Sequence, residues 1–342
     1  MNILYTCDNN YVWLMGISML SLFENNKKAD KIIVYLFSEH IAIDNQNRLK
    51  SIAYLYGREC IIIDLPELDI PKALCSLRWP KSAFSRLYSA ELLPKEIYKI
   101  LYIDCDTIIL GSLAELWEMN VDEYTVYGVK DCIGLNYRRN IGLDTHSLYI
   151  NAGVLLLNLE KLRMFRITAL IDGFLKSYGN TIHYADQDIL NGMFNGKFGI
   201  LPSKYNVMTL EFMYNYTEIR AIRHPINYYS REEIKNAIEH PCITHFTTCM
   251  LNIRPWFRNS THPLTNEFMH YKMMSPWKDK TLNVMHMDLG TKTRLLKLLH
   301  KLPLTLELNI LGLLHSVIYP KMICLRAFLK NILRINQERI QE

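Results

Sequence analysis

The stretch Ile100-Leu-Tyr-Ile-Asp104-Cys-Asp106-Thr-Ile-Ile109 decides how this chain of 342 residues is interpreted. Its first four residues are apolar and predict a buried strand, and two carboxylates one residue apart follow. Two acids at the end of a buried strand are costly unless a positive group meets them. Ligands bind at this edge of an open α/β sheet, so the pair suggests a divalent cation that holds substrate phosphates. The alternative is a strand-end turn whose acids are solvated or paired with Lys and Arg.

Strand and helix patterns alternate on both sides of this stretch. The predicted strands are residues 2–6, 31–37, 60–63, 100–103 and 124–129, the predicted helices are residues 11–23, 43–56, 84–93 and 186–194, and a further apolar segment covers residues 150–159. Such alternation predicts an α/β fold with a mostly parallel, doubly wound sheet flanked by helices.

The charge of the chain is unevenly distributed. The whole chain has 39 Lys and Arg against 34 Asp and Glu, but residues 291–342 contain nine Lys or Arg and three Glu, which leaves 30 basic and 31 acidic side chains before them. This near-neutral body argues against nucleic-acid binding. The eight cysteines are scattered without a Cys-x-x-Cys pair, and no signal peptide precedes the first predicted strand. We therefore expect a cytoplasmic protein.

The C-terminal region has a pattern of its own. Residues 292–301 and 323–335 place Lys and Arg among apolar residues at helical spacing. Between them, residues 302–319 are apolar but contain Pro303, Glu307, Asn309, Gly312 and His315. Because a bilayer span needs about 20 uninterrupted apolar residues, we predict a poor spanning segment. A cationic amphipathic helix instead suits peripheral attachment to the cytoplasmic face of an anionic membrane, and a contact with the domain or within a homo-oligomer is the alternative.

Four further groups of polar residues stand at the ends or starts of predicted elements. Asp8, Asn10 and Tyr11 follow the first strand, where they could bind and stack on a base or form an ordinary Asx turn. The other groups are Asn151-Ala-Gly153, Asp186-Gln-Asp188 and His245. Each has a plain structural alternative: a strand start, a helix N-cap and a structural histidine, respectively.

The order and spacing of these groups resemble the retaining glycosyltransferases of family 8, which include bacterial lipopolysaccharide galactosyl- and glucosyltransferases and glycogenin. The matching stretches are residues 3–11, 86–91, 98–116, 149–159, 185–194 and 243–256. The resemblance implies a GT-A fold, a Rossmann-like domain with a manganese-dependent Asp-x-Asp motif. It also implies transfer of galactose or glucose from a UDP-sugar to a saccharide acceptor of a cell-surface glycan, such as lipopolysaccharide or a lipid-linked oligosaccharide. The expected regions are a catalytic domain of residues 1–277 and a helical region of residues 278–342.

The resemblance gives each matching residue a role. Asp104, Asp106 and His245 are the implied ligands of Mn²⁺, with Mg²⁺ as the alternative ion, and the ion would bridge the donor phosphates as a Lewis acid. The implied donor-binding residues are Thr6, Asp8, Asn10, Tyr11, Arg86, Asn151, Asp186 and Arg254. The implied catalytic residues are Gln187, Asp188 and Asp131.

Retention of configuration leaves two mechanisms. A double displacement needs an enzymic nucleophile, and the amide oxygen of Gln187 is a poor one. In a front-face mechanism the leaving phosphate deprotonates the acceptor hydroxyl, and the protein supplies positioning and charge stabilisation. We favour the second route, in which Gln187 steadies an oxocarbenium-like transition state.

The sequence departs from the family pattern after His245. Relatives have a short segment with Gly and then Lys-Pro-Trp, whereas this chain has a longer segment without Gly and places Arg254 at the lysine position. Arg78 and Trp79 occupy the place of an acceptor-side residue, so the sequence does not predict the acceptor.

Two other functions compete with glycosyl transfer. Asp-x-Asp-Thr also occurs in haloacid-dehalogenase phosphatases, but these generally carry it on the first strand and have a later Gly-Asp motif that this chain lacks. A non-catalytic sugar-nucleotide-binding protein would be expected to have lost one of Asp104, Asp106 and His245, and all three are present.

Overall fold

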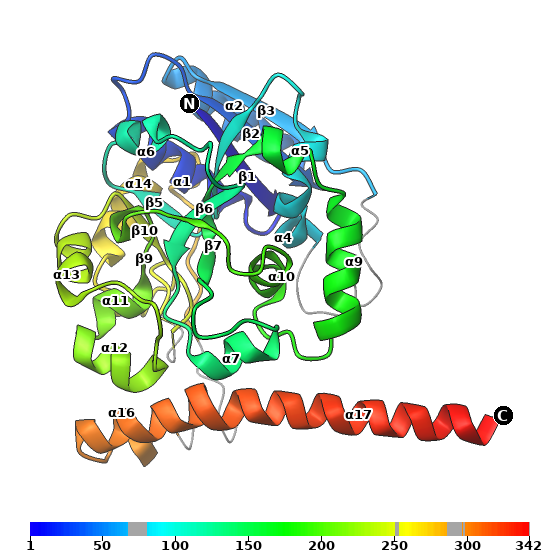
Figure 1. Ribbon diagram of the computed structural model, residues 1–342. Helices are drawn as coiled ribbons and strands as arrows, with labels where there is room; N and C mark the ends of the chain where they lie inside the picture. The colour runs from blue at the N-terminus through cyan, green and yellow to red at the C-terminus, as the bar shows by residue number, and fades with distance from the viewer. Residues whose placement is uncertain (68–80, 250–252, 286–295, 297, 342) are drawn as a thin grey trace.

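The computed structural model describes residues 1–67, 81–249, 253–285, 296 and 298–341, and Figure 1 shows their arrangement. The described strands are β1 (Asn2–Asp8), β2 (Ile33–Glu39), β3 (Glu59–Asp64), β4 (Lys99–Ile103), β5 (Thr107–Ile109), β6 (Val126–Lys130), β7 (Ile150–Asn158), β8 (Gly199–Ile200), β9 (Val207–Met208) and β10 (Ile243–His245). The helices of the body are α1 (Val12–Asn25), α2 (Ile43–Leu55), α4 (Lys81–Ser85), α5 (Ser89–Leu92), α6 (Ala114–Glu118), α7 (Leu135–Asn140), α8 (Leu159–Leu162), α9 (Ile167–Tyr178), α10 (Ala185–Met193), α11 (Thr209–Met213), α12 (Tyr216–Arg223), α13 (Arg231–Glu239) and α14 (Thr265–Met274).

Seven strands form the central sheet, in the order β3-β2-β1-β4-β7-β6-β8. The pairs from β3 to β4 and the pair of β6 with β8 are parallel, whereas β7 runs antiparallel to both of its neighbours. The predicted α/β class with a mostly parallel sheet is therefore confirmed. A second sheet of three short strands, in the order β5-β10-β9, continues from the end of β4.

Two layers of apolar side chains enclose the central sheet. Alternate residues of β1 show the division, because Ile3, Tyr5 and Cys7 belong to one core cluster and Leu4 to the other. The first cluster includes residues of α1, α2 and α14, and the second includes residues of α7, α9 and α10. Strands β4 and β7 are buried along their whole length, which explains why their sequences are almost continuously apolar.

The predicted helix at residues 84–93 is broken in the structure. It consists of α4, a 3₁₀ turn η1 (Arg86–Tyr88) and α5. All three residues of η1 are buried. The tighter turn thus places Arg86 inside the protein, whereas the helical pattern predicted one regular element.

One long helical segment lies beneath the body and runs to the C-terminus (Figure 1). It consists of α16 (Leu304–Leu313), a π-helical turn η3 (Leu314–Ile318) and α17 (Tyr319–Gln341). Pro320 has no N–H to bond the carbonyl of Ser316, and that carbonyl instead accepts a hydrogen bond of 2.8 Å from Asn136 Nδ2. The π turn therefore has a cause in the sequence and fixes the segment to α7.

Residues 302–319 were predicted to be too interrupted to span a membrane. The length and composition of the helix that contains them contradict this prediction. Leu304–Lys330 is helical over 27 residues and contains an 18-residue window with a mean hydropathy of 1.5, of which 28% is buried. Pro303 precedes the helix and does not break it, while Asn309, Gly312 and His315 lie within it. Within the described residues this is the one helix long and apolar enough to cross a bilayer, which alone is weak evidence for a span. Most of the predicted helix at residues 292–301 lies outside the described residues.

Candidate active site

The Asp-x-Asp pair lies in the turn between β4 and β5, as its sequence predicted. Asp104 N donates to Gly153 O at 2.7 Å, and the Asp104 carbonyl accepts from Thr107 Oγ1 at 2.9 Å. These bonds hold the turn against β7. Because β10 pairs antiparallel with β5, His245 lies opposite Thr107 and is brought back to the pair from far along the chain.

Asp104, Asp106 and His245 form a group whose ligand atoms all lie within 4.8 Å of one another. His245 Nε2 is 3.2 Å from Asp106 Oδ1 and 3.6 Å from Asp104 Oδ2. Two carboxylates and one imidazole fit a hard divalent cation such as Mn²⁺ or Mg²⁺. Among the described residues, this is the one group of acids, histidines and cysteines close enough to hold an ion.

A residue that sequence reasoning missed orients the histidine. His245 Nδ1 lies 3.1 Å from Asn206 Oδ1, and Asn206 Nδ2 in turn donates to Asn151 Oδ1 at 2.9 Å. If Nδ1 carries the proton for Asn206, the lone pair of Nε2 points to the two carboxylates. Asn206 is separated from His245 by 39 residues and stands in no recognisable motif, so the sequence held no signal for it.

The electrostatics of the group favour charged side chains. Burial opposes ionisation of Asp106, but His245 and Arg254 outweigh it and lower the Asp106 pKa to about 2. Burial likewise lowers the His245 pKa, and the two aspartates outweigh burial so that the net change is a rise. Asp106 is therefore an anion over the whole physiological pH range.

Arg86 bridges two acids on the other side of the group. Its guanidinium lies 3.0 Å from Asp104 Oδ1 and 3.2 Å from Asp186 Oδ2, and Nη1 donates to Ala152 O at 2.7 Å. The guanidinium also stacks 4.3 Å from the centre of the Tyr102 ring. Burial raises the pKa of Asp186 to about 6 in spite of Arg86. This arginine thus fixes the positions of both carboxylates.

Gln187 is held by a closed network of hydrogen bonds. Its Oε1 accepts from Asn151 Nδ2 and from Ala152 N, both at 3.1 Å, and its Nε2 donates to Asp131 Oδ2 at 3.0 Å. Asp188 is directed away from the pocket and accepts from Tyr149 Oη at 2.6 Å and from two backbone N–H groups. The residue before this motif, Ala185, has a φ of +46°, a left-handed conformation that costs energy for a residue with a Cβ.

The residues expected to bind the base form a turn at the end of β1. Asp8 Oδ1 accepts from the backbone N–H groups of Asn10 and Tyr11, each at 2.9 Å, which is the Asx turn weighed as the alternative. The Tyr11 ring is 42% exposed, and its hydroxyl accepts from Arg254 Nη1 at 3.2 Å. Arg254 Nη2 also lies 3.5 Å from Asp106 Oδ2, so this arginine connects the aromatic ring with the acid group.

A pocket of about 250 Å³ brings most of the predicted residues together. Those that line it are Arg86, Asp104, Asp106, Asp131, Asn151, Asp186, Gln187, His245 and Arg254. The predicted residues outside its lining are Thr6, Asp8, Asn10, Tyr11 and Asp188. The lining residues that sequence reasoning missed include Cys132, Ile133, Tyr184, Met208, Leu210 and Arg223. Arg78 and Trp79 lie outside the described residues.

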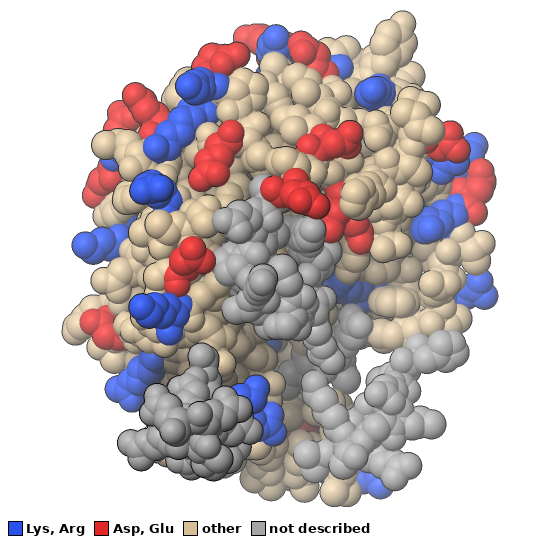
Figure 2. All heavy atoms as spheres, turned by 90° about the vertical axis from the view of Figure 1, so that its right-hand side faces the viewer, with Lys and Arg blue, Asp and Glu red and all other residues tan. Residues whose placement is uncertain are grey.

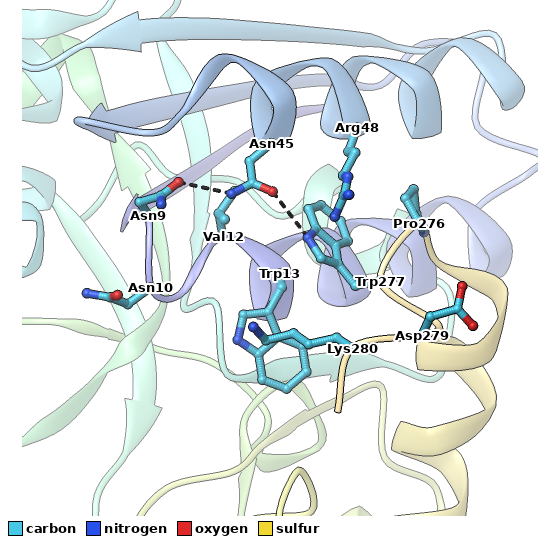
Figure 3. A pocket seen from close by; sticks show the side chains of 10 residues that line it. All are labelled: Asn9, Asn10, Val12, Trp13, Asn45, Arg48, Pro276, Trp277, Asp279 and Lys280. Atoms are coloured by element: carbon cyan, nitrogen blue, oxygen red, sulfur yellow. Dashed lines mark hydrogen bonds between the residues drawn. The ribbon is translucent and has the colours of Figure 1, made fainter. Parts of the chain in front are cut away.

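Asn10 borders a second hollow, between α1, α2 and the segment after α14 (Figure 3). Trp13 and Trp277 line it, with Lys280 lying 5.4 Å from the centre of the Trp13 ring. Asn45 accepts from Trp277 Nε1 at 3.3 Å and donates to Asn9 Oδ1 at 3.0 Å. These contacts connect the loop after β1 with the C-terminal part of the body.

Unsatisfied polar atoms concentrate in the first pocket. Among the described residues, seven buried side-chain nitrogen or oxygen atoms make no hydrogen bond. Four of them belong to residues that line this pocket: Tyr184 Oη, Asp186 Oδ2, Arg223 Nε and Arg254 Nε. Because buried polar groups in native proteins are almost always bonded, this concentration makes the pocket the candidate site for a polar ligand.

Comparison with known proteins identifies the family to which the body of the chain belongs. The model of the family described as "Glycosyl transferase family 8" matches residues 2–260. General stress protein A of Bacillus subtilis is 25% identical over 282 residues, which cover 81% of this chain and 94% of that protein. Lipopolysaccharide 1,2-glucosyltransferase of Escherichia coli is 25% identical, covering 82% and 79%, and lipopolysaccharide 1,3-galactosyltransferase of Salmonella typhimurium is 26% identical, covering 81% and 79%.

The fold is also that of a solved structure. The galactosyltransferase LgtC, crystallised with donor and acceptor sugar analogues, superposes with a TM-score of 0.69 at 23% identity, covering 81% of this chain and 96% of LgtC. This likeness confirms the predicted GT-A fold of the body.

Proposed function

The chain belongs to glycosyl transferase family 8, and from that premise we propose that it transfers galactose or glucose from a UDP-sugar to a saccharide acceptor with retention of configuration. The observation that supports this most directly is the acid–histidine group at the end of β4, placed beside two arginines in one pocket. We further propose an acceptor on a cell-surface glycan such as lipopolysaccharide, because two relatives are named as lipopolysaccharide glycosyltransferases.

Asp104, Asp106 and His245 are the proposed ligands of Mn²⁺, or of Mg²⁺. A bound cation would neutralise the charge that develops on the leaving diphosphate. Arg254 is positioned to add to this charge neutralisation, because it contacts Asp106 and its Nε makes no hydrogen bond within the described residues. Asn206 keeps the imidazole in place for that task.

The donor base is proposed to lie at the Asx turn. Tyr11 would stack on uracil, with Asp8, Asn10 and the backbone of Thr6 at the edge of the nucleoside. The exposure of the Tyr11 ring supports this role, since a ring buried in the core could not accept a base. Arg254 then lies between the base site and the phosphate site, in the position that the family gives to lysine.

The sugar is proposed to lie against Arg86, Asn151, Asp186 and Gln187, with Asp131 and Asp188 holding these groups in place. Asp186 Oδ2 has an ion-pair partner in Arg86 but accepts no hydrogen bond from the residues that the structure describes, so it can accept one from a sugar hydroxyl. The Gln187 amide is already fixed by four hydrogen bonds. A fixed neutral amide can steady positive charge near the anomeric carbon but is a poor nucleophile, which favours the front-face mechanism.

The domain division and the membrane contact are also proposals. We propose that residues 1–277 form the catalytic domain and that residues 278–342 attach it peripherally to the cytoplasmic face of an anionic membrane. Apolar side chains exposed at the end of η3 and on α17 recur at spacings of four and three residues, which places them on one face: Ile318, Met322, Leu325, Leu329 and Ile332. Lys321, Arg326 and Lys330 lie among them. A helix contact within a homo-oligomer is the alternative use of this face.

Nucleic acid is not a proposed partner. On the face that Figure 2 shows, acidic and basic side chains are interspersed over the described residues, without a broad basic area. This agrees with the near-neutral charge of the first 290 residues.

A donor screen tests the function. UDP release should be measured from UDP-galactose, UDP-glucose and UDP-N-acetylglucosamine, with Mn²⁺ and with EDTA. We expect slow, metal-dependent hydrolysis of one of the first two donors even without an acceptor. Tight binding of a UDP-sugar without turnover on any saccharide would support a non-catalytic binding protein. Metal-dependent release of phosphate from a phosphomonoester would instead support a phosphatase.

A further inference from the structure

Arg223 is the pocket residue whose charge the reaction described so far does not use. It is the last residue of α12, and its guanidinium borders the same pocket as the acid–histidine group. One of its amino groups donates to His315 Nε2 in the C-terminal helical segment. Its Nε is buried and makes no hydrogen bond with the described part of the chain.

The other two arginines of the pocket have acidic partners. Arg86 contacts Asp104 and Asp186, and Arg254 contacts Asp106. Arg223 forms no ion pair with any residue that the structure describes, and its side-chain hydrogen bond is to a ring nitrogen of His315. Asp131, which lines the same pocket, favours the charged form of Arg223 electrostatically but does not contact it. A buried cation without an anion is costly, because its lost hydration is not replaced. Among the described residues, no carboxylate lies in contact with the guanidinium of Arg223.

The guanidinium is held in place from outside the pocket. Ser316 Oγ donates to Ile222 O at 3.0 Å, which fixes the end of α12 against the π turn of the C-terminal segment. The His315 ring packs 5.4 Å from the Tyr137 ring, and Tyr137 packs 5.2 Å from Tyr184, which lines the pocket. An arginine held by packing loses less side-chain freedom when it binds a ligand, so its position suits recognition.

Arg223 and the acid–histidine group line the same pocket but share no hydrogen bond or ion pair among the described residues. The described contacts of Arg254 reach Asp106 and Tyr11, toward the proposed phosphate and base sites. Those of Arg223 reach the C-terminal segment and none of the proposed metal ligands. A donor diphosphate held at Asp104 and Asp106 would therefore leave the guanidinium of Arg223 to the second substrate.

We propose that Arg223 binds an oxyanion, a phosphate or a carboxylate, carried by the acceptor saccharide. This inference rests on the proposed function and names its substrate class, a glycan acceptor with an acidic group near the hydroxyl that is glycosylated. Planar guanidinium groups bind both oxyanions with paired N–H donors. Neutral saccharides are then poorer acceptors because they leave the charge of Arg223 unpaired.

The first experiment uses the wild-type protein. Turnover should be compared with a lipopolysaccharide core oligosaccharide before and after phosphatase treatment. For a carboxylate, methyl glucuronide is compared with methyl glucoside. We expect the acidic member of at least one pair to be preferred by about tenfold or more in kcat/KM, the scale of a charge-assisted hydrogen bond. Equal kcat/KM within both pairs would overturn the proposal whatever the variants do.

The second experiment uses three variants. Arg223→Gln should bring the acidic-to-neutral ratio of kcat/KM close to one, and Arg223→Lys should keep an intermediate ratio. Arg220→Gln removes the same charge from an exposed position one turn earlier on α12 and should keep the wild-type ratio. If Arg223→Gln lowers kcat/KM for both members equally, Arg223 has a structural role and the proposal is wrong.

Binding separates this inference from the proposed function. In EDTA, glucose 6-phosphate should bind the wild type and Arg220→Gln more tightly than Arg223→Gln, with glucose as the neutral control. Displacement of glucose 6-phosphate by UDP alone would assign Arg223 to the donor and overturn the inference. Arg223-dependent binding without transfer to any acceptor would contradict hexosyl transfer and leave the anion site standing. Transfer without any Arg223-dependent preference would support hexosyl transfer and contradict the anion site.

Discussion

The turn after β4 contains buried charged side chains, whereas one face of α17 carries exposed apolar side chains. At the turn, charged groups are buried and nearly all have partners within the chain, as Asp106 does with His245 and Arg254. On α17, apolar groups are exposed, and Leu325 and Phe328 are 57% and 61% accessible. The first region is ready for its ligand before binding, whereas the second can bury its apolar surface only against something outside the described chain. We therefore expect that substitutions on the exposed face of α17 change what the protein attaches to without changing the candidate active site, and the reverse.

The largest effect on turnover is expected from a substitution in the turn after β4. Asp106→Ala removes one proposed metal ligand but keeps the backbone bond from Phe246 N to residue 106. Turnover should fall by at least about a hundredfold, as when one electrostatic stabiliser of a transition state is lost. Wild-type activity should vanish in EDTA and return with Mn²⁺. Asp172→Ala, which removes an exposed acid on α9, is the control. Full activity of Asp106→Ala, or of the wild type in EDTA, would refute the metal assignment.

A smaller effect is expected when the second region is changed. Leu325→Glu combined with Leu329→Glu places charge on the exposed face of α17 and leaves the pocket untouched. Since full burial of a leucine contributes about 1.5–3 kcal/mol, binding to anionic vesicles should weaken by tens of times even if burial at the surface is partial. Donor hydrolysis should stay at the wild-type rate. Leu55→Glu, at an exposed position of α2, is the matched control in a cosedimentation assay.

The same variants decide between a membrane and a second copy of the chain. Sedimentation velocity should show one oligomeric state for the wild type and the double variant if the face meets lipid. A loss of oligomer in the double variant, with vesicle binding unchanged, would favour the homo-oligomer contact instead.

The next largest effect is expected when the residue that orients His245 is removed. Asn206→Ala removes the partner of His245 Nδ1 without touching a proposed ligand. Outer partners of metal-binding histidines typically change metal affinity by about 10–100-fold, and we expect the low end here because two carboxylates remain. The Mn²⁺ concentration for half-maximal turnover should rise by that factor, with a smaller change in the maximal rate. A purely structural role would lower the maximal rate at every Mn²⁺ concentration.

Local patterns predicted the first region better than the second. Asp104, Gln187 and His245 could be found because each belongs to a short motif at the start or end of an apolar segment, and strand pairing then brought them together. Asn206 and Arg223 could not be found, because their roles depend on partners 39 and 92 residues away. The continuity of the C-terminal helix was missed because Pro303, Glu307, Asn309, Gly312 and His315 were counted as interruptions. Pro303 precedes the first turn, and the other four residues lie within the helical segment.

The last prediction concerns stability and not activity, and it rests on Glu211, a buried acid on α11. It accepts hydrogen bonds from Met208 N at 2.8 Å and from the Tyr228 hydroxyl, yet burial outweighs them and raises its pKa to about 7. The folded state therefore holds more protons than the unfolded state between about pH 4.5 and pH 7. The free energy of unfolding must fall as the pH rises through this range and level off above it.

Glu211→Gln removes this dependence because an amide does not titrate. Relative to the wild type, the variant should gain on the order of 2 kcal/mol in unfolding free energy between pH 5 and pH 8, measured by urea denaturation at both values. Glu232→Gln, at an exposed position of α13, should show the wild-type pH dependence. Parallel pH curves for Glu211→Gln and the wild type would mean that the acid is ionised in the folded state. Hydrogen bonds from Met208 N and the Tyr228 hydroxyl would then compensate the buried charge of Glu211, as partners within the chain do for Asp106. The body would differ even more clearly from α17, whose exposed apolar side chains have no such partners among the described residues.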